Sequence, residues 1–477
     1  MNKYFLAFLL CPGSLLAQSS SPGTSASLLL THVTVIDATG TPAKPDMTVH
    51  VRNHRIVAVR PSSAMAPPKD AVVVNASGKY LIPGLWDMHV HTGRRDTFLP
   101  LYIANGVTGV RDMGGDLEEP TGDLSSRYVQ LRLWREAIER GSLVGPRFVS
   151  AGFLIDGYPW PGNVSVANAE EGPQAVDVLK QIGVDFIKVK SALSKEAYLA
   201  IADESRRQRI VFAGHVPDAV RAANASDAGQ KSIEHLTGVS LGCSREESQL
   251  MEELATAIEA RDRVRYGRAT ARVTETFDTK AAAALFSKFA KNQTWQVPTL
   301  VELKANALGS SVSAAGQTPG SPDPHWRFLP APLRERWSKE QRPGDSEAGQ
   351  KLFATEISLA KQMHEAGVPF MTGTDSANPF VLPGYSLHEE LKLFVIAGFS
   401  PMEALQAATI NPARYLGKAE DLGTIETGKF ADFVLLDANP LENISNTQRI
   451  WAVVANGRYL SRSDLDAMLA GVERTAN

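Results

Sequence analysis

The feature that most constrains the fold is a regular alternation of strand-like and helical stretches through the middle of the chain. Eight short apolar runs have β character, and segments with helical periodicity, such as 195–207 and 281–291, separate several of them. The predicted strands are 80–90, 107–113, 148–155, 186–190, 210–216, 232–236, 295–301 and 370–375. Strands that alternate with helices predict an α/β protein with a parallel sheet, and eight such units predict a TIM-type (β/α)8 barrel.

Both ends of the chain are instead rich in short β-type runs. Four runs lie before residue 82 and three more follow residue 432, with clusters of Gly, Pro, Asn and Asp between them. This pattern is typical of antiparallel strands joined by tight turns. We therefore expect residues 18–82 and 417–477 to form one small β-sandwich, with the barrel spanning residues 83–416.

Two segments exceed what a minimal barrel needs. Residues 243–272 are highly charged with a helical pattern, and residues 304–350 are rich in Gly, Ser, Pro and Arg. Insertions of this length between barrel elements often form lids or substrate-contacting loops. A surface insertion with no role at the site is the alternative interpretation.

The first residues resemble an export signal. One positive charge at Lys3 precedes an apolar run over 4–10, and the sequence turns polar after Ala17. We therefore expect residues 1–17 to be a signal peptide and the mature protein to be periplasmic or secreted. Its removal would leave Cys243 as the single cysteine, so no intramolecular disulfide could form. No later stretch approaches the ~20 apolar residues that a spanning helix needs.

The charge of the chain argues against a nucleic-acid partner. The formal net charge is −3, and no run is rich in Lys or Arg. Proteins that bind nucleic acid normally carry a basic patch or stripe. A homo-oligomer is compatible with the sequence, which does not fix the assembly.

Residues that bind metals recur at the predicted strand ends. His89 and His91 close the first predicted strand, and residues two apart in a strand face the same side. Two imidazoles on one face form half of a zinc site. Four further candidates end later predicted strands: Lys188, His215, His235 and Asp375. Active sites of such barrels lie at the carboxyl ends of the strands, so we expect all these side chains to meet.

Lys188 is unusual because it lies inside an apolar run. Burying a lysine is costly unless the side chain gains a partner or loses its charge. Lys190 faces the same side of an extended strand and is the alternative candidate for the same role. Because Lys190 lies further past the strand end, we interpret it as a solvated or substrate-facing amine.

Two other groups near the strand ends allow more than one interpretation. Arg111, at the end of the second predicted strand, could meet a substrate carboxylate or form a structural ion pair, and we favour the ion pair. The loop Tyr158-Pro159-Trp160-Pro161-Gly162 follows the third predicted strand. Its aromatic side chains could pack against a substrate or simply anchor the loop.

The motifs at both ends of the predicted barrel resemble the amidohydrolase superfamily. The first motif is Leu81-Ile82-Pro83-Gly84-Leu85-Trp86-Asp87-Met88-His89-Val90-His91. The second combines Ala407-Ala408-Thr409-Ile410-Asn411-Pro412-Ala413 with Gly423-Thr424-Ile425-Glu426-Thr427-Gly428-Lys429-Phe430-Ala431-Asp432-Phe433-Val434. The resemblance spans nearly all of the mature chain. Within the superfamily, the chain resembles the imidazolonepropionase-like branch, which holds metal-dependent Xaa-Pro-type dipeptidases.

This resemblance implies a site for two divalent metal ions, with zinc as the expected metal. The implied ligands are His89, His91 and Asp375 for the more buried ion, and His215 and His235 for the more exposed ion. Carbon dioxide would convert Lys188 to a carbamate that bridges the two ions, which would also remove the cost of a buried ammonium. A metal-bridging hydroxide would attack the substrate, and Asp375 would accept its proton and pass it to the leaving amine.

The implied reaction is hydrolysis of an amide or peptide bond, as in a dipeptidase or an N-acyl amino acid amidase. A lactonase, a phosphotriesterase-like hydrolase or a detoxifying amidase could use the same ligands, because these reactions need the same nucleophile and Lewis acid. A third hypothesis is a non-catalytic metal-binding surface protein. Asp375 argues against it, because a purely structural metal site would need no proton acceptor.

Overall fold

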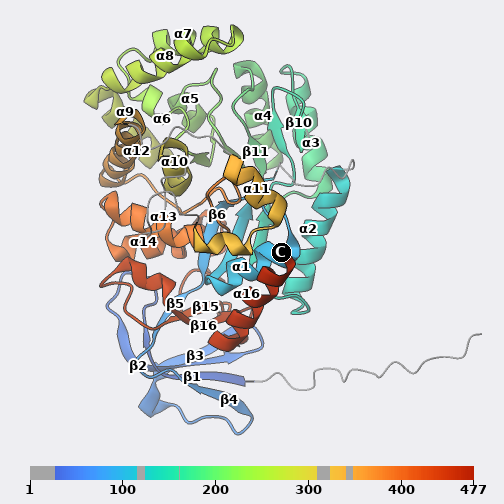
Figure 1. The fold of residues 1–477 in the computed structure, drawn as a ribbon, viewed down its shortest axis with the longest axis vertical. Helices are drawn as coiled ribbons and strands as arrows, with labels where there is room; N and C mark the ends of the chain where they lie inside the picture. Colours follow the sequence, from blue (N-terminus) through green and yellow to red (C-terminus); the bar gives the residue numbers. More distant parts are fainter. Residues whose placement is uncertain (1–26, 115–123, 161, 309–322, 340–346, 477) are drawn as a thin grey trace, which may run out of the picture.

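The structure is a computed structural model of the chain, and it describes residues 27–114, 124–160, 162–308, 323–339 and 347–476. The predicted signal peptide over 1–17 lies outside these residues. Figure 1 shows a β-sheet at one end of the molecule and the helical pair α7 (Glu247–Glu259) and α8 (Arg263–Glu275) at the other. Strands and helices that alternate along the chain fill the space between them. None of the described helices is long and apolar enough to cross a membrane.

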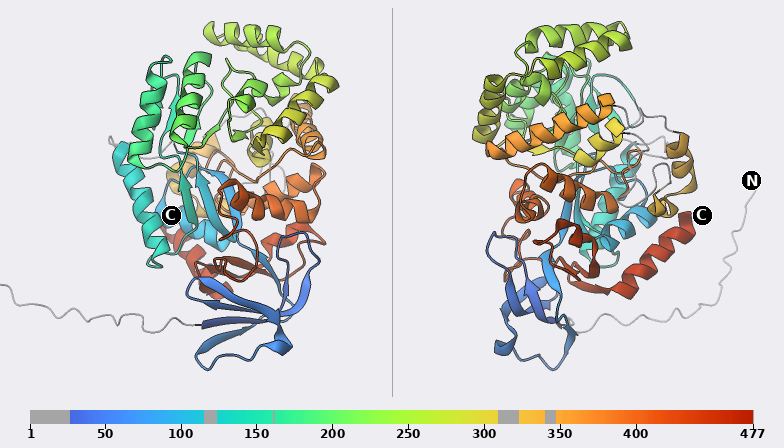
Figure 2. Two further views of the ribbon diagram at one scale, coloured as in Figure 1. Left: turned by 180° about the vertical axis from the view of Figure 1, so that it is seen from behind. Right: turned by 60° about the vertical axis from the view of Figure 1, so that its left-hand side comes forward.

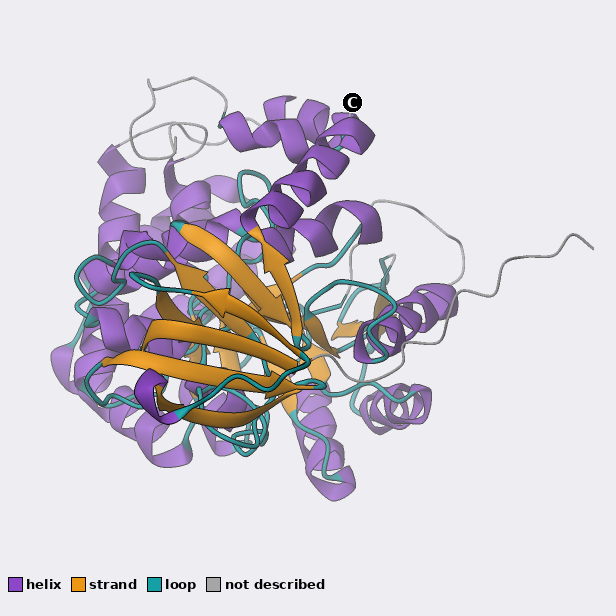
Figure 3. Cartoon of the chain, turned by 90° about the horizontal axis from the view of Figure 1, so that it is seen from below, coloured by secondary structure: helices purple, strands orange, loops and turns teal. Residues whose placement is uncertain are grey.

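Strands from both ends of the chain form one mixed sheet, seen from below in Figure 3. Its hydrogen-bonded order is β17-β16-β15-β5-β1-β2-β3, with β4 paired to β1. Buried residues from both ends, among them Leu30, Val51 and Phe433, pack into one apolar core on this sheet. The strands are β1 (Ser27–Val35), β2 (Lys44–Arg52), β3 (Arg55–Pro61), β4 (Ala71–Asn75), β5 (Tyr80–Pro83), β15 (Phe433–Leu436), β16 (Ile450–Ala455) and β17 (Arg458–Ser461).

The predicted pairing of the two chain ends in one β unit is therefore confirmed. The predicted antiparallel pattern is wrong in part, because β1 pairs in parallel with both β4 and β5. The chain leaves the β2–β3 hairpin and crosses back before each of these strands, so both run in the same direction as β1.

The middle of the chain supplies parallel strands, which lie among helices in both views of Figure 2. One group has the order β6-β7-β8 and the other has the order β10-β9-β11-β12-β13-β14. The strands are β6 (Leu85–Val90), β7 (Val107–Asp112), β8 (Arg147–Ser150), β9 (Leu154–Asp156), β10 (Asn163–Ser165), β11 (Ile187–Val189), β12 (Phe212–Gly214), β13 (Ser232–Glu234) and β14 (Trp295–Val297).

The eighth predicted strand, 370–375, is not a regular strand. Main-chain hydrogen bonds nevertheless join this segment to both of its neighbours. Met371 N–H donates to Gln296 O of β14 over 3.0 Å, and Met88 N–H of β6 donates to Thr372 O over 2.9 Å. The segment therefore connects the two groups of parallel strands.

The irregular segment packs closely against both neighbouring strands. A Cβ at Gly373 would lie 2.4 Å from Val297 Cγ1 and 2.8 Å from His89 Cβ, so only glycine allows the segment to approach both neighbouring strands. Two residues later, Asp375 has a φ of 62°, in the left-handed region. The backbone thus leaves strand geometry where it reaches the carboxyl ends of β6 and β14.

Three other predicted strands are divided or interrupted by another element, and the remaining four are shorter than predicted. The run 80–90 divides at Gly84 into β5 and β6, which belong to different sheets. Thr108 packs closely against Gly84, where a Cβ would lie 1.9 Å from Thr108 Oγ1. The run 148–155 divides into β8 and β9, and the run 295–301 ends early because a helix begins at Leu300.

Helices occupy most of the connections between the parallel strands. The charged insertion forms the α7–α8 pair, which has a small core of its own built from Leu250, Ala269 and Val273. The remaining helices are α1 (Arg95–Ala104), α2 (Leu124–Glu139), α3 (Glu171–Ile182), α4 (Lys195–Gln208), α5 (Ala222–Asp227), α6 (Val239–Gly242), α9 (Thr279–Asn292), α10 (Leu300–Leu308), α11 (Ala331–Lys339), α12 (Glu347–Glu365), α13 (Tyr385–Ile396), α14 (Pro401–Ala407), α15 (Ile410–Tyr415) and α16 (Arg462–Ala476).

We predict that Gly109→Ala destabilises the protein. Gly109 of β7 is paired with Trp86 of β6, and a Cβ there would lie 2.1 Å from the indole Cε2 atom. Overpacking of this kind lowers the free energy of unfolding by about 1–3 kcal/mol. Gly267→Ala in α8 is the control, because a Cβ there would meet no atom within 4 Å.

The control should raise the free energy of unfolding by about 0.5–1 kcal/mol, because alanine restricts the unfolded chain. Urea unfolding followed by circular dichroism measures both effects. A Gly109→Ala variant as stable as the wild type would show that β6 and β7 pack less tightly than described.

Candidate metal centre

A pocket of about 730 Å³ is lined by side chains from the carboxyl ends of the parallel strands. All the metal-binding candidates from the sequence line it: His89, His91, Lys188, His215, His235 and Asp375. The side chains of His89 and Lys188 are fully buried at its base. Residues separated by almost 290 positions in the chain thus share one space, because parallel strands bring their carboxyl ends to the same side.

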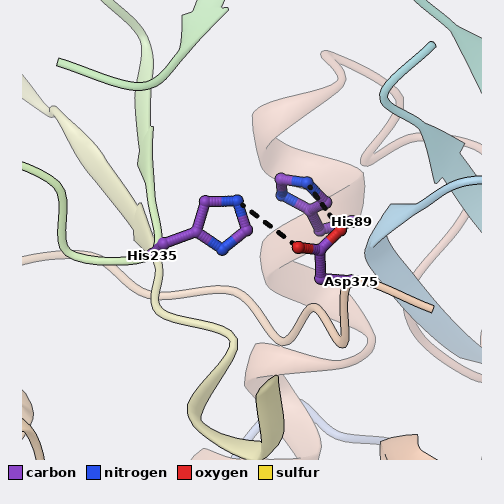
Figure 4. Close-up of side chains that lie close together, drawn as sticks. All are labelled: His89, His235 and Asp375. Atoms are coloured by element: carbon purple, nitrogen blue, oxygen red, sulfur yellow. Dashed lines mark ion pairs between the residues drawn. The ribbon is translucent and has the colours of Figure 1, made fainter. Parts of the chain in front are cut away.

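Asp375 lies at the centre of these side chains. Its Oδ1 atom is 3.0 Å from His91 Nε2 and 3.5 Å from His89 Nε2, and its Oδ2 atom is 3.8 Å from His235 Nε2. Figure 4 shows His89 and His235 on either side of this carboxylate. Potential ligand atoms of His89, His235 and Asp375 all lie within 4.8 Å of one another, which is close enough to share one metal ion. The His215 ring centroid is 5.0 Å from that of His235.

The four histidines share one hydrogen-bonding arrangement. Each makes a hydrogen bond through its Nδ1 atom. The partners are Glu234 Oε2 for His89 (2.7 Å), Gly114 O for His91 (2.6 Å), Ser191 Oγ for His215 (2.7 Å) and Thr299 Oγ1 for His235 (2.7 Å). Fixing Nδ1 in this way orients each ring, as in metal sites where the non-ligating nitrogen is hydrogen-bonded.

Two of these partners also determine the tautomer. A carboxylate and a carbonyl oxygen can only accept hydrogen bonds, so Nδ1–H must be the donor in His89 and in His91. With the proton on Nδ1, the neutral form of either ring has the lone pair that a metal ion needs on its Nε2 atom.

Glu234 is itself held by a buried ion pair. Arg111 Nη2 donates to both Glu234 oxygens over 2.8 and 2.9 Å, and both side chains have no exposed surface. Arg111 also donates to Ser232 Oγ and to the Tyr415 hydroxyl. The predicted structural ion pair for Arg111 is therefore confirmed, and because the side chain is fully enclosed it cannot meet a substrate carboxylate.

Burial favours the neutral form of His89, His215 and His235. It lowers the pKa of His89 and of His215 well below the usual 6.5, and the nearby Lys188 lowers both further. Burial also lowers the pKa of His235 to about 4, although Asp375 opposes this shift. These imidazoles are therefore unprotonated at neutral pH, which is the form that binds metals.

The surroundings also shift the pKa values of Lys188 and Asp375. Burial lowers the pKa of Lys188 from 10.5 to about 8, with Glu234 and Asp375 opposing part of the shift. Burial would raise the pKa of Asp375, but the imidazoles of His89, His235 and His91 lower it well below the usual 3.8. Near neutral pH the pocket thus holds an ionised carboxylate beside a lysine that can readily lose its proton.

The backbone at the site is held in unusual conformations. His235 and Asp375 have φ values of 57° and 62°, which side chains with a Cβ adopt at a cost of about 1–2 kcal/mol each. Asp87 helps to hold the segment near Asp375, because its carboxylate accepts from Thr374 N–H (3.0 Å) and from Thr374 Oγ1–H (2.6 Å). Burial raises the pKa of Asp87 to about 7.

The side chains fit a divalent metal. Among the described residues, neither His89 Nε2 nor Lys188 Nζ has a hydrogen-bond partner, although both atoms are buried. Leaving buried polar atoms unpaired is costly, and functional sites are one place where proteins do so. Imidazole nitrogen and carboxylate oxygen are the donors that zinc accepts in catalytic sites.

Comparison with known proteins identifies the family. Residues 80–460 match the sequence family described as the amidohydrolase family. The chain belongs to the amidohydrolase family. It is therefore a metal-dependent hydrolase that acts on carbon–nitrogen bonds, with a His/Asp metal-binding group in its pocket. The resemblance inferred from the two sequence motifs is confirmed.

Individual relatives within this family differ in how much of the chain they match. Ochratoxinase from Aspergillus niger is 25% identical over 425 residues, which cover 78% of this chain and 73% of that protein. Imidazolonepropionase from Shouchella clausii is 46% identical over 88 residues, which cover only 18% of this chain and 20% of that protein.

Solved structures extend the comparison to nearly the whole amidohydrolase chain. A putative prolidase from Bifidobacterium longum has a TM-score of 0.64 at 26% identity, covering 94% of this chain and 99% of that chain. The bottromycin amidohydrolase has a TM-score of 0.72 at 23% identity, covering 94% and 91%. This second similarity is one of fold.

The sequence interpretation missed two classes of residue in this amidohydrolase. The first supports the candidate ligands, as Glu234 and Asp87 do, and the signal was present because each is an acidic residue inside an apolar strand. The second completes the pocket wall from the inserted segment 304–350, which contributes Asn306 and Arg336. No local pattern in the sequence indicated which residues of that segment reach the pocket.

We predict that Glu234→Gln weakens metal binding. Glutamine cannot accept from both His89 and Arg111 as a carboxylate does, so the His89 tautomer is no longer enforced and the Arg111 charge loses its counterion. Loss of such a supporting partner lowers metal affinity about 10–100-fold. Competition with a chromogenic chelator measures the affinity.

Asp432→Asn is the matched control for this change. Asp432 is also a buried carboxylate paired with an arginine, Arg147 (2.6 Å), but it lies outside the residues that line the pocket. This control should lose stability while keeping wild-type metal affinity. Wild-type metal affinity in Glu234→Gln would contradict the role assigned to the Glu234–His89 hydrogen bond.

Proposed function

We propose that this amidohydrolase is an exported, binuclear enzyme that cleaves an amide or peptide bond in a small substrate, as a dipeptidase or an N-acyl amino acid amidase does. The observation that carries the proposal is the number of donors in one pocket. Four imidazoles, one aspartate and the buried Lys188 side chain line it. A zinc ion in a protein takes about four ligands, including any water, so this set supports two ions rather than one.

We propose the division of the ligands that the family resemblance implies. His89, His91 and Asp375 would hold the deeper ion, and His215 and His235 would hold the ion nearer the mouth. Lys188, as a carbamate, would bridge them. Lys188 is favoured over Lys190 because its amine is enclosed and has no hydrogen-bond partner among the described residues. The Lys190 amine instead lies 4.6 Å from the centre of the Trp160 ring.

The chain itself would supply orientation and proton transfer. When bound, the metal pair would lower the pKa of water and polarise the scissile carbonyl. The ionised Asp375 carboxylate would accept the proton of the attacking water and transfer it to the leaving amine. Its position among the candidate ligands, 3.0 Å from His91 Nε2 and lining the pocket, supports this role.

The similarities favour a peptide-like substrate. Solved structures that resemble this chain over 91% or more of its length include a putative prolidase and a Xaa-Pro dipeptidase with bound methionine. The A. niger relative is named for ochratoxin rather than for a peptide. The proposal therefore specifies the bond that is cleaved and leaves the acyl group open.

A hydrolysis screen on the zinc-loaded protein tests this function. Dipeptides that differ at the C-terminal residue and N-acyl amino acids form the main panel, with a lactone and a phosphotriester as comparison substrates. We expect kcat/KM for at least one amide to exceed that for both comparison substrates. Turnover of the lactone or the phosphotriester alone would overturn the amidase proposal, and metal binding without any turnover would support a non-catalytic protein.

We predict that reconstitution of the metal-free enzyme depends on bicarbonate and on pH. Carbamate forms from a neutral amine, and with a pKa of about 8 half of the Lys188 side chains are neutral at pH 8. An ordinary lysine would be only about 0.3% neutral at that pH. Activity regained with zinc and bicarbonate should therefore rise as pH increases through 8 and level off above it.

Lys188→Ala provides the control for the bridge. This variant should show no response to bicarbonate, and short-chain carboxylates should restore part of its activity by replacing the missing oxygen ligand. Full activity in Lys188→Ala with both metals bound would contradict the assignment and favour Lys190 as the bridge.

We also propose the organisation expected from the sequence: a signal peptide over 1–17, a TIM-type (β/α)8 barrel over 83–416, and a β-sandwich from 18–82 and 417–477. The hydrogen bonds that link 369–372 to β14 and β6 support the barrel, and the mixed sheet supports the joined ends. N-terminal sequencing of the exported protein tests the first part, because retention of Met1 would contradict cleavage. A crystal structure in which residues 370–375 make no main-chain hydrogen bonds to β14 or β6 would contradict the barrel.

A further inference from the structure

The pocket carries two cationic side chains that the proposed metal site does not use. Lys190 follows β11 and Arg336 lies on α11, so they reach the pocket wall from elements far apart in the chain. Neither side chain forms an ion pair with any of the residues that the structure describes. Cations without a counterion in a pocket attract an anionic group of a ligand.

Lys190 has a defined position relative to the candidate metal ligands. It lies two residues after Lys188 and lines the same pocket. Its ammonium packs over the Trp160 ring at 4.6 Å, a cation–π contact that limits its freedom while leaving its N–H groups able to donate. A partly ordered donor loses less entropy when it binds a ligand than a freely rotating one.

Arg336 contributes a second donor from α11. In the same helix, Lys339 pairs with Glu335 over 2.6 Å, so the carboxylate nearest in sequence is already engaged by another cation. The acidic side chain Glu302 also lines the pocket, but it accepts a hydrogen bond from Asn306. The guanidinium of Arg336 is exposed and is among the side chains that line the pocket.

The distance from Lys188 to Lys190 along the chain is compatible with binding a carboxylate on the leaving half of an amide substrate. In a dipeptide or an N-acyl amino acid, three bonds separate the scissile carbonyl carbon from the carbon of the free α-carboxylate, a span of at most about 4.3 Å. Two residues along a strand advance by about 6.6 Å. With the scissile carbonyl near the Lys188 side of the site, the long Lys190 side chain can reach that carboxylate.

We propose that the enzyme requires a free α-carboxylate on the leaving amino acid, and that Lys190 and Arg336 bind this carboxylate. The proposal rests on the amide-hydrolase function and narrows it to dipeptides and N-acyl amino acids with an uncapped C-terminus. Lys190 is a specificity-determining residue in this account rather than a metal ligand. Substrates whose C-terminus is amidated lack the anion and lose the contact.

The test compares each dipeptide with its C-terminal amide, using the zinc-loaded full chain. We expect the wild type to cleave the free acid with kcat/KM about tenfold or more above that of the amide, because hydrogen bonds to charged groups contribute on this scale. Lys190→Gln and Arg336→Gln should each reduce this acid-to-amide ratio, mainly through KM for the acid. Lys190→Arg should retain most of it.

Lys280→Gln is the matched control, because Lys280 is an exposed lysine on α9 outside the pocket. It should leave the acid-to-amide ratio at the wild-type value. Metal content is measured for every variant, and Lys190→Gln should retain both ions. Loss of metal in Lys190→Gln would overturn the proposal and make Lys190 a candidate bridge.

The outcomes separate this inference from the function on which it depends. If the wild type cleaves no amide of either kind, the amide-hydrolase function itself fails. If it cleaves the free acid and the C-terminal amide equally well, the function stands and the carboxylate requirement is wrong. An unchanged ratio in both Lys190→Gln and Arg336→Gln would show that other residues bind the carboxylate.

Discussion

The site depends on one repeated interaction, the hydrogen bond that fixes Nδ1 of each pocket histidine. Without these bonds the rings could rotate or exchange tautomers, and their Nε2 atoms would not meet in one space. The strongest case is His89, whose partner Glu234 is fixed by the buried guanidinium of Arg111. A buried ion pair contributes little net stability by itself, so its value here lies in the orientation of a ligand.

The second requirement is the irregular segment that completes the pocket. Asp375 lies beside three imidazoles at a point where the chain has left strand geometry. Gly373 allows close approach to β6 and β14, Asp87 holds Thr374, and the left-handed backbone at Asp375 turns the carboxylate into the pocket. The surrounding packing must offset about 1–2 kcal/mol for that backbone conformation. Strained backbone at a functional site is a recurring feature of enzymes.

Much of this site could be predicted from the sequence, because the candidate ligands follow apolar runs and a parallel arrangement brings the ends of such runs together. The same reasoning failed for 370–375, because its irregularity arises from contacts with β6 and β14 that local sequence does not encode. Glu234 was overlooked although it adjoins His235, and Arg336 could not be found because its segment has no periodic pattern. The parallel pairing of β1 with β4 and β5 likewise depends on how the chain crosses over.

We propose that the six candidate ligands in the pocket hold two metal ions joined through Lys188. Elemental analysis of the purified protein, after incubation with zinc and bicarbonate above pH 8 and removal of unbound metal, tests it most directly. We expect two zinc ions per chain in the wild type and fewer in Lys188→Ala. A wild-type protein that binds a single ion, with the same stoichiometry in Lys188→Ala, would contradict it.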